Sequence, residues 1–361
     1  MDALKLYRGR FMNFLLRNLT LFLLAAVLVG CSTVKSTDGV MKADTRKGGF
    51  MGLTTKDDIE VEYAKGFASV EKVLIGGFKV GFNDSKKLTQ KTSSMFRPST
   101  SQTGLLKLDG VDQATRQQIT DDMYDHFVQA LQDAGYQLVS RDEFTRIPAY
   151  KEVKEVDFPY QDDNSGLFSS YGVGYFYSPR QIGSRQPFFH GELKDPGMFA
   201  GFSAMGIMKA PGEFAKVSEA RIINVAYVVD FAGASEGDFF STALEVGQVM
   251  TIDSAILGIS KGGTGIQTAS TGQLTLGQPI ASEISFATIQ DNTSEVEAGA
   301  TMAVNALTGF FRGGVVGALH QSASQTREYV FSADQEKYAE AAREVLAKTN
   351  TLLTTKMASL R

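Results

Sequence analysis

The alternation of hydrophobic and polar positions along the chain predicts three strands. Apolar residues recur at every second position in 70–82, with Leu74 and Phe78 on the same face, and β-branched residues are frequent there. The segment 221–231 has a stronger alternation of the same kind, and the short segment 136–139 is typical of a third strand. These segments predict a sheet.

The spacing changes to that of a helix in three other segments. In 111–134 apolar residues recur every three or four positions while the opposite side is polar, and Gly135 follows as a helix-ending residue. The segment 333–360 has the same pattern and predicts an amphipathic C-terminal helix. The segment 296–319 is rich in Ala, Gly and Val, which favours either a buried helix packed through small residues or one that contacts lipid or a neighbouring subunit.

Two mostly polar segments show neither the strand period nor the helix period. Residues 31–60 mix Ser, Thr, Lys, Asp and Gly, which predicts a flexible tether, and residues 83–110 are interpreted as a long loop. Residues 151–210 are different again, because glycine and aromatic residues crowd together without a period. We interpret them as an insertion that is ordered by aromatic packing or by a partner, or as irregular loops that cover one edge of the core.

Two long β-like runs, 243–260 and 272–290, flank a Gly/Thr/Ser-rich connection and predict a long hairpin over 243–290. Each run is long enough to cross a membrane as a strand. Gln248, Asp253 and Glu283 would then have to face a lumen or water. A soluble sheet explains the same alternation.

The start of the chain resembles the signal peptide of bacterial lipoproteins. A basic segment precedes an apolar run over 19–29, which is too short to remain as a membrane-spanning helix. The run ends in Leu28-Val29-Gly30-Cys31, which is similar to the lipobox of that class, and Cys31 is the only cysteine in the chain. The resemblance implies cleavage before Cys31, acylation of Cys31 with palmitate-type chains, and a signal peptide over 1–30. The start is either Met1 or Met12.

The resemblance also implies a location. Ser32 follows the cysteine where an Asp would act as a retention signal in this class, so we expect sorting to the outer membrane, with the body lipid-anchored and facing the periplasm. Several acyl chains hold a protein on a membrane stably, whereas one chain binds only marginally. The alternatives are an ordinary cleaved signal peptide and an uncleaved anchor.

The charge of the mature chain bears on its partners. Removing 1–30 takes away four basic residues and one acidic residue, which leaves 32 basic and 39 acidic side chains and a formal charge of −7. Nucleic-acid binding requires a basic surface, so we expect no nucleic-acid partner.

Catalytic motifs are absent from the sequence. The three histidines (His126, His190 and His320) are far apart, and the Asp122/His126 pair at helical spacing supplies too few ligands for zinc. The glycines of 262–265 lack the Lys and Ser/Thr of a phosphate-binding loop. We therefore expect no enzyme activity, no catalytic residues, no metal and no cofactor. A glycan hydrolase with two carboxylates stays open as a minor alternative.

In order, the mature chain predicts an α+β protein: a sheet covered by helices, with a long β-hairpin and an amphipathic C-terminal helix. The boundaries are a signal peptide (1–30), a lipidated tether (31–60), the first half of the core (61–150), the aromatic-rich insertion (151–210), and the second half of the core with the hairpin (211–361). The strand at 73–82, the helix at 118–134 and the strand at 221–231 resemble the core of the curli secretion-channel (CsgG-like) lipoproteins. They are also similar to the amino-terminal domain of TolB.

This resemblance implies a non-enzymatic outer-membrane lipoprotein that serves envelope assembly or secretion. It would be a homo-oligomer with envelope protein partners, and it would be a component of an export channel. The alternative is a monomeric, periplasm-facing adaptor that binds a protein or a glycan through the aromatic segment 151–210. The oligomeric mass distinguishes the two hypotheses.

Overall fold

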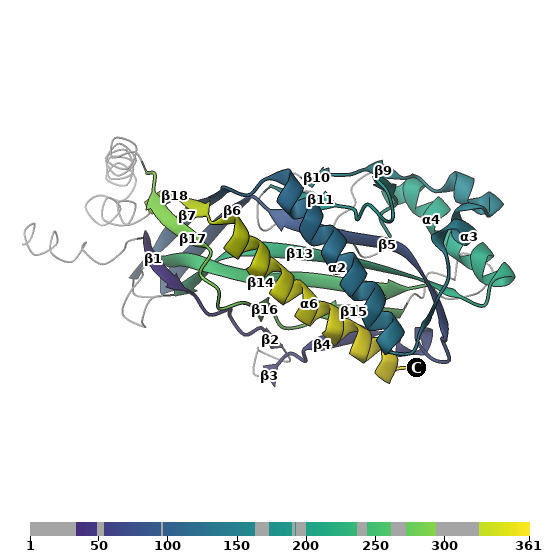
Figure 1. Ribbon diagram of the computed structural model, residues 1–361. Coiled ribbons are helices and arrows are strands. Elements are labelled where there is room, and N and C mark those ends of the chain that lie inside the picture. Colours follow the sequence, from purple (N-terminus) through teal and green to yellow (C-terminus); the bar gives the residue numbers. More distant parts are fainter. Residues whose placement is uncertain are drawn as a thin grey trace, which may run out of the picture.

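A computed structural model of the chain describes residues 34–48, 54–94, 97–162, 173–189, 192, 200–236, 244–260, 272–293 and 325–361. The described residues form an α+β fold in which strands predominate, as the sequence predicts (Figure 1). The predicted signal peptide with Cys31, the connection 261–271 and the small-residue segment 296–319 lie outside the described residues. None of the helices formed by the described residues is long and apolar enough to cross a membrane.

The main sheet has ten strands and contains the most buried part of the chain. Its principal path runs, in spatial order, through β10 (Tyr160–Asp162), β11 (Gly174–Tyr177), β5 (Lys72–Asn83), β13 (Arg221–Glu236), β14 (Leu244–Ile259), β15 (Gly272–Leu276) and β4 (Ile59–Glu62). Three strands lie off this path: β1 (Val34–Val40) and β16 (Ile280–Ala281) pair with β14, and β8 (Gln137–Leu138) pairs with β5. The central strands β5 and β13 are parallel, whereas β13 and β14 are antiparallel.

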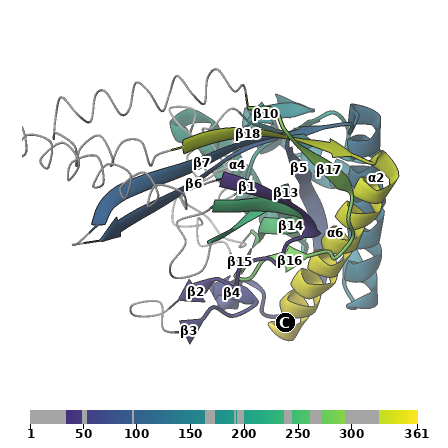
Figure 2. The same cartoon turned by 90° about the vertical axis from the view of Figure 1, so that its left-hand side faces the viewer.

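A second sheet of four strands lies beside the main sheet at the end where β1 begins (Figure 2). Its order is β17 (Ala287–Asp291), β18 (Gln325–Ala333), β7 (Arg97–Asp109) and β6 (Ser85–Ser94). Two small pairs complete the strands: β9 (Val156–Asp157) with β12 (Arg185–Gln186), and β2 (Lys47–Gly48) with β3 (Thr54–Thr55).

Two long helices cover one face of the main sheet, α2 (Gln113–Asp133) and α6 (Gln335–Ser359) (Figure 1). Each begins at an aspartate whose side chain accepts backbone N–H groups of the first turn, Asp112 from Thr115 and Asp334 from Glu336 and Lys337. Gly135 follows α2 with φ +82°, a left-handed conformation that glycine adopts without strain. The sequence prediction of this helix and of its end is therefore confirmed.

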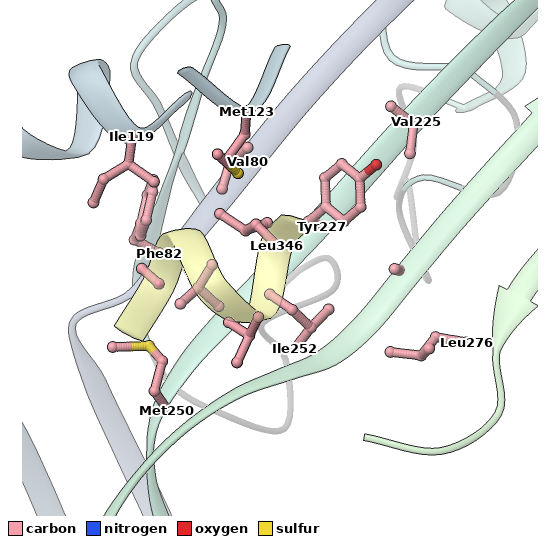
Figure 3. Packing of buried hydrophobic residues seen from close by; sticks show 14 of the residues in the cluster. Val80, Phe82, Ile119, Met123, Val225, Tyr227, Met250, Ile252, Leu276 and Leu346 are labelled. Atoms are coloured by element: carbon pink, nitrogen blue, oxygen red, sulfur yellow. The ribbon is translucent and has the colours of Figure 1, made fainter. Parts of the chain in front are cut away.

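Apolar side chains fill the space between these helices and the sheet. Figure 3 shows Ile119 and Met123 of α2 and Leu346 of α6 facing Val80, Tyr227 and Ile252 of the three central strands. Ile119, Leu346, Val80, Tyr227 and Ile252 are fully buried, and Met123 is nearly so. The hydrophobic effect of this cluster is the main source of stability for the fold.

The helices α3 (Arg141–Thr145), η3 (Pro148–Glu152) and α4 (Ala200–Val217) cover part of the opposite face. The short helix η2 (Ala64–Gly66) lies beside β15. Phe144 of α3 and Phe214 of α4 meet edge to face, with ring centroids 5.6 Å apart. They pack with Leu74 and Ile222 in a separate apolar cluster. The sheet is therefore covered on both faces and not on one alone.

Leu74 lies on that opposite face, which corrects the predicted parity of the first strand. The pairing of β5 with β13 shifts by one residue, so Ile75 pairs with Ile223 and Gly77 pairs with Asn224. This bulge reverses the alternation, and Phe78 faces the long helices. A Cβ on Gly76 would lie 2.5 Å from Ile222, so only glycine fits there.

The predicted tether at 31–60 is wrong for the part that the structure describes. Val34–Val40 forms β1, which pairs in parallel with β14, and Val34 is only 4 % exposed. Ile59–Glu62 forms β4 at the edge of the main sheet. Polar strands of this kind are held by backbone pairing with a distant partner, which no local pattern reveals.

The predicted loop at 83–110 is also wrong, because it forms the hairpin β6–β7. Its strands pair from Ser85 with Lys107 to Ser94 with Arg97. Most residues of the hairpin are Ser, Thr, Gln or Lys, so it lacks the apolar alternation that marks a half-buried strand.

The predicted hairpin at 243–290 differs from the structure in its second half. β14 is a single long strand, but 272–290 is divided among β15, β16 and β17, and β17 belongs to the other sheet. Pro279, which has no N–H to donate, lies between β15 and β16. The longest pairing of β14 is with β13.

The aromatic-rich segment 151–210 is partly integrated into the main sheet. Its strand β11 pairs with β5, and Phe176 and Tyr177 are almost fully buried. Phe188 packs on Tyr160 and Phe176 with ring centroids 5.0 and 5.9 Å apart. In the described part of this segment the aromatic residues thus serve mainly as packing.

Candidate functional site at the anchor end of the body

The described part of the chain begins with β1, three residues after Cys31, the residue that the sequence predicts to carry lipid. The described chain starts with Val34, whose side chain is buried and whose carbonyl accepts a hydrogen bond of 3.1 Å from the Tyr329 hydroxyl. Three residues span at most about 10 Å when extended. An acyl group on Cys31 would therefore hold this end of the body close to the membrane surface.

Several strand ends gather at this end, which we call the anchor end. The last residue of β13, Glu236, pairs with the first of β14, Leu244, and Leu244 also pairs with Val34. β18 begins there at Gln325, opposite Gln102 of β7. Figure 2 shows the hairpin β6–β7 extending past the start of β1 at this end.

Gln248 links β1, the strand that follows the predicted anchor, to the core of the body. It is fully buried, and its side-chain oxygen accepts the N–H groups of Phe286 and Ala287, each at 2.8 Å. Its amide nitrogen donates to the carbonyl of Asp38 in β1 at 3.2 Å and to that of Ala287 at 2.8 Å. β1 is thus held by a completed hydrogen-bond network as well as by its pairing with β14.

Gln248 therefore does not face a lumen or water, which a membrane-spanning hairpin would require of it. Asp253 forms an ion pair with Arg46, and Glu283 is exposed on the body. β14 lies in the middle of the main sheet, with Met250 and Ile252 beneath α6. The strand is part of the core of the body.

A group of buried charges joins the two sheets near the anchor end. Asp230 of β13 is 1 % exposed and accepts from Lys86 of β6 and, at 3.3 Å, from Asn83 of β5. Arg116 of α2 forms an ion pair with Asp84. The buried Asp230 and the partly exposed Asp84 each have a cation beside them, so the group attaches β6 to the body.

A second buried ion pair lies on the face of the main sheet opposite the long helices. Lys79 of β5 and Glu192 are both fully buried, with Nζ and Oε2 2.8 Å apart. Glu192 also accepts from the N–H of Phe189 at 2.8 Å and from the Asn224 amide at 3.0 Å. Burial lowers the pKa of the Lys79 ammonium, and the neighbouring Glu192 opposes that shift.

The surroundings of Lys79 give it a structural role. Its ammonium group lies 5.4 Å from the ring centroids of both Phe188 and Phe189. Gln186 donates to the Phe78 carbonyl at 2.8 Å and accepts from the Phe78 N–H at 3.1 Å. These contacts hold the segment 185–189, which we call the strap, against the sheet. The sequence gives no signal for this site beyond a lysine inside an apolar strand.

The Asp122/His126 pair, which supplies too few ligands for zinc, is used in helix packing. Asp122 forms an ion pair of 2.8 Å with Arg343 of α6, and the His126 ring lies 3.2 Å from the Asn350 amide. Within the described ranges no group of three or more His, Cys, Asp or Glu side chains is arranged to hold a metal ion. His190 and His320 lie outside those ranges.

A shallow groove of about 290 Å³ lies where α2 and α6 diverge. His126, Asp133 and Thr354 are among the residues that line it. The Asp133 carboxylate accepts from Gln129 at 2.8 Å, and the Thr354 hydroxyl donates to the Asn350 carbonyl at 2.9 Å. These polar groups are therefore used within the two helices.

The comparisons with known proteins add no family. No family model, no curated protein and no solved structure matches the chain.

Proposed function

We propose that this protein is a lipid-anchored, non-enzymatic lipoprotein of the outer membrane that acts in envelope assembly or secretion. The observation that supports it is the entry of the chain into the fold at Val34, directly after the lipobox-like Cys31. A body attached in this way remains at the membrane surface and does not reach away from it. The resemblance to the curli secretion-channel lipoproteins favours an oligomeric export component.

The buried charges are consistent with the non-enzymatic part of the proposal. The carboxylates of Asp84, Asp230 and Glu192 each have a cation within ion-pair distance, and Glu192 is further occupied by two N–H donors. A glycosidase requires two carboxyl groups that face a common cleft and remain available to substrate. Carboxylates fixed in structural ion pairs do not meet that requirement.

The adaptor remains the alternative. It requires aromatic side chains of 151–210 to be available to a partner, but Phe176, Tyr177 and Phe189 are buried within the body. This burial favours the oligomeric export component over the adaptor.

The test uses the full chain expressed in a Gram-negative host. Intact-mass measurement of the mature protein should find cleavage before Cys31 and acylation of Cys31, and Cys31→Ser should abolish both. The matched pair Ser32→Asp and Ser32→Ala tests sorting, since only the aspartate should move the protein to the inner membrane. An unacylated mature protein would overturn the proposal.

The oligomeric form is tested on the acylated protein extracted in mild detergent. Light scattering and electron microscopy are expected to show a ring of several subunits. A monomer would exclude the channel form and leave the adaptor.

A further inference from the structure

The edge strands of the two sheets differ in how far their backbone groups are used. At one end of the main sheet, β10 has only three residues. At one end of the second sheet, the Gln248 side chain bonds both the N–H and the carbonyl of Ala287 in β17, each at 2.8 Å. The opposite ends are β4 in the main sheet and β6 in the second sheet. These two edges are the ones able to pair with a further strand.

The pairing of β4 with β15 determines which groups of β4 form its edge. The Gly277 N–H donates to the Asp58 carbonyl at 2.9 Å, and in an antiparallel ladder such bonds recur at every second residue. The N–H and C=O groups of Ile59 and Val61 therefore point away from β15. Within the described ranges no backbone hydrogen bond reaches them from that side. The side chains of both residues pack against the core.

The edge of β6 follows from its pairing with β7 in the same way. The Leu108 N–H donates to the Asp84 carbonyl at 2.9 Å, so the N–H and C=O groups of Lys87 and Thr89 point away from β7. No backbone hydrogen bond joins these groups to another residue that the structure describes. The side chains of Lys87 and Thr89 are exposed, whereas Leu88 lies on the other face and packs against the core.

The two edges carry opposite charge. Residues 57–62, which include β4, contain four acidic residues and no basic residue: Asp57, Asp58, Glu60 and Glu62. Among the described residues, only Glu60 of these four has an ion-pair partner, Lys56. β6 has no acidic residue, and near its start Lys86 is held by Asp230 while Lys87 is exposed and has no ion-pair partner in the described part of the chain. Opposite charges on neighbouring strands attract, so β4 favours a basic partner strand and β6 an acidic one.

A parallel pairing of the two edges matches their faces as well as their charges. In a parallel ladder a residue bonds the two residues on either side of the one that it lies beside. Ile59 of β4 then bonds the neighbours of Leu88 in β6 and lies beside Leu88, apolar next to apolar. On the other face, Asp58 lies beside Lys87. An antiparallel pairing would instead set Ile59 directly opposite an exposed polar residue of β6.

We infer that β4 of one copy of the chain pairs in parallel with β6 of a second copy, and that this contact joins the subunits of the oligomer. The inference rests on the oligomeric form of the proposed function. β4 and β6 are different surfaces of the body, β4 near its bottom and β6 at its left in Figure 2, so each copy offers one edge to each of two neighbours. A head-to-tail contact of this kind generates a ring when the rotation between neighbours closes.

Disulfide crosslinking tests the register of the pairing. Glu60 lies beside Thr89 of the next copy, and neighbouring strands are about 4.8 Å apart, a separation that a disulfide can span. The acylated double variant Glu60→Cys/Thr89→Cys, extracted in mild detergent and oxidised, should give a ladder of covalent oligomers in a non-reducing denaturing gel. Each single variant should give none. The matched control Glu60→Cys/Thr326→Cys, with the second cysteine on the same sheet face but two strands inside the edge, should remain monomeric in the gel.

A charge exchange tests the attraction between the edges. Lys87→Glu places like charges beside each other and should raise the concentration at which the oligomer dissociates several-fold, as measured by light scattering over a dilution series. Adding Asp58→Lys restores an opposite pair and should recover the affinity. Lys337→Glu, the same charge change at an exposed residue of α6, should leave the dissociation unchanged. A loss that Asp58→Lys does not recover would contradict the pairing.

The native mass of the same samples separates the two ways to fail. An oligomer that forms no disulfide between residues 60 and 89 would overturn the pairing of β4 with β6 and leave the proposed function standing. A protein that is acylated but monomeric at every concentration would overturn the oligomeric form of the proposed function, and the inference with it.

Discussion

The two faces of the main sheet are closed by different means. On one face α2 and α6 lay apolar side chains such as Met123 and Leu346 on the central strands. On the other face the strap is attached through the buried charges of Lys79 and Glu192 and through the amide of Gln186. Apolar packing tolerates small adjustments, whereas a buried ion pair is strongly destabilised when one partner is removed.

The largest effect is expected from breaking the ion pair. Glu192→Ala leaves the Lys79 ammonium buried without a counter-ion and should lower the free energy of unfolding by about 3–5 kcal/mol. The double variant Lys79→Met/Glu192→Leu should recover most of this loss, because it removes both charges. Chemical denaturation measures both variants, and a double variant as unstable as Glu192→Ala would contradict a role for the charges.

On the face of the sheet covered by α2 and α6, the loss of stability should increase with the side-chain volume that a substitution removes. Leu346→Ala deletes a fully buried side chain between α6 and the sheet and should cost about 2–5 kcal/mol. Chemical denaturation measures the loss, and the volume-conserving control Leu346→Met should cost less than about 1.5 kcal/mol. A Leu346→Met variant as unstable as Leu346→Ala would contradict the dependence on volume.

A smaller effect, with a pH signature, is expected from Tyr227→Phe. The variant removes the hydrogen bond to Asn350 and should cost about 1–2 kcal/mol at neutral pH. Burial raises the pKa of Tyr227 well above its ordinary value near 10, so the folded state keeps a proton that the unfolded state loses. This contribution is complete below about pH 10 and is lost as the pH rises further, by about 1.4 kcal/mol per pH unit.

The measurement for Tyr227→Phe is therefore a series of denaturation curves from neutral to alkaline pH. The variant should lose stability less steeply than the natural protein above pH 10. Parallel curves would show that the hydroxyl is not sheltered in the folded state.

The smallest effect is expected from Asp122→Asn, which breaks a half-exposed ion pair with Arg343 between the helices. Such pairs contribute less than about 1 kcal/mol. For each protein, the melting curve with zinc should coincide with the curve with a chelator. The comparison detects a bound metal, because a metal that binds the folded state raises the melting temperature. If zinc raised the melting temperature of the natural protein and Asp122→Asn abolished that rise, Asp122 and His126 would be shown to bind the metal.

The elements that the sequence predicts well are those with a local pattern. The helix at 111–134 has an apolar stripe, a capping aspartate and a terminal glycine, and the structure places α2 within two residues of it at each end. The strand at 221–231 has β-branched residues at alternate positions and corresponds to the first two thirds of β13. In both cases the local preference and the tertiary environment agree.

The elements that the sequence does not predict depend on distant partners. β1 and β6 are polar, and they are strands because β14 and β7 offer them a continuous row of backbone groups. For the same reason the sequence does not predict the ion pair of Lys79 and Glu192, which are far apart in the chain and meet only after folding. At the anchor end, Cys31 is predicted from the sequence, but the pairing of Val34 with Leu244 is visible only in the structure.

The parallel pairing of β1 with β14 has a consequence for the order of events in biosynthesis. The strand that is synthesised first pairs with a strand that is synthesised late, so β1 has no place in the sheet until most of the chain has been made. Contacts between such distant segments form slowly, because a long loop must close before they contribute any stability. Until then Val34–Val40 lacks its partner in the sheet, and the pairing can form only after β14 has been made.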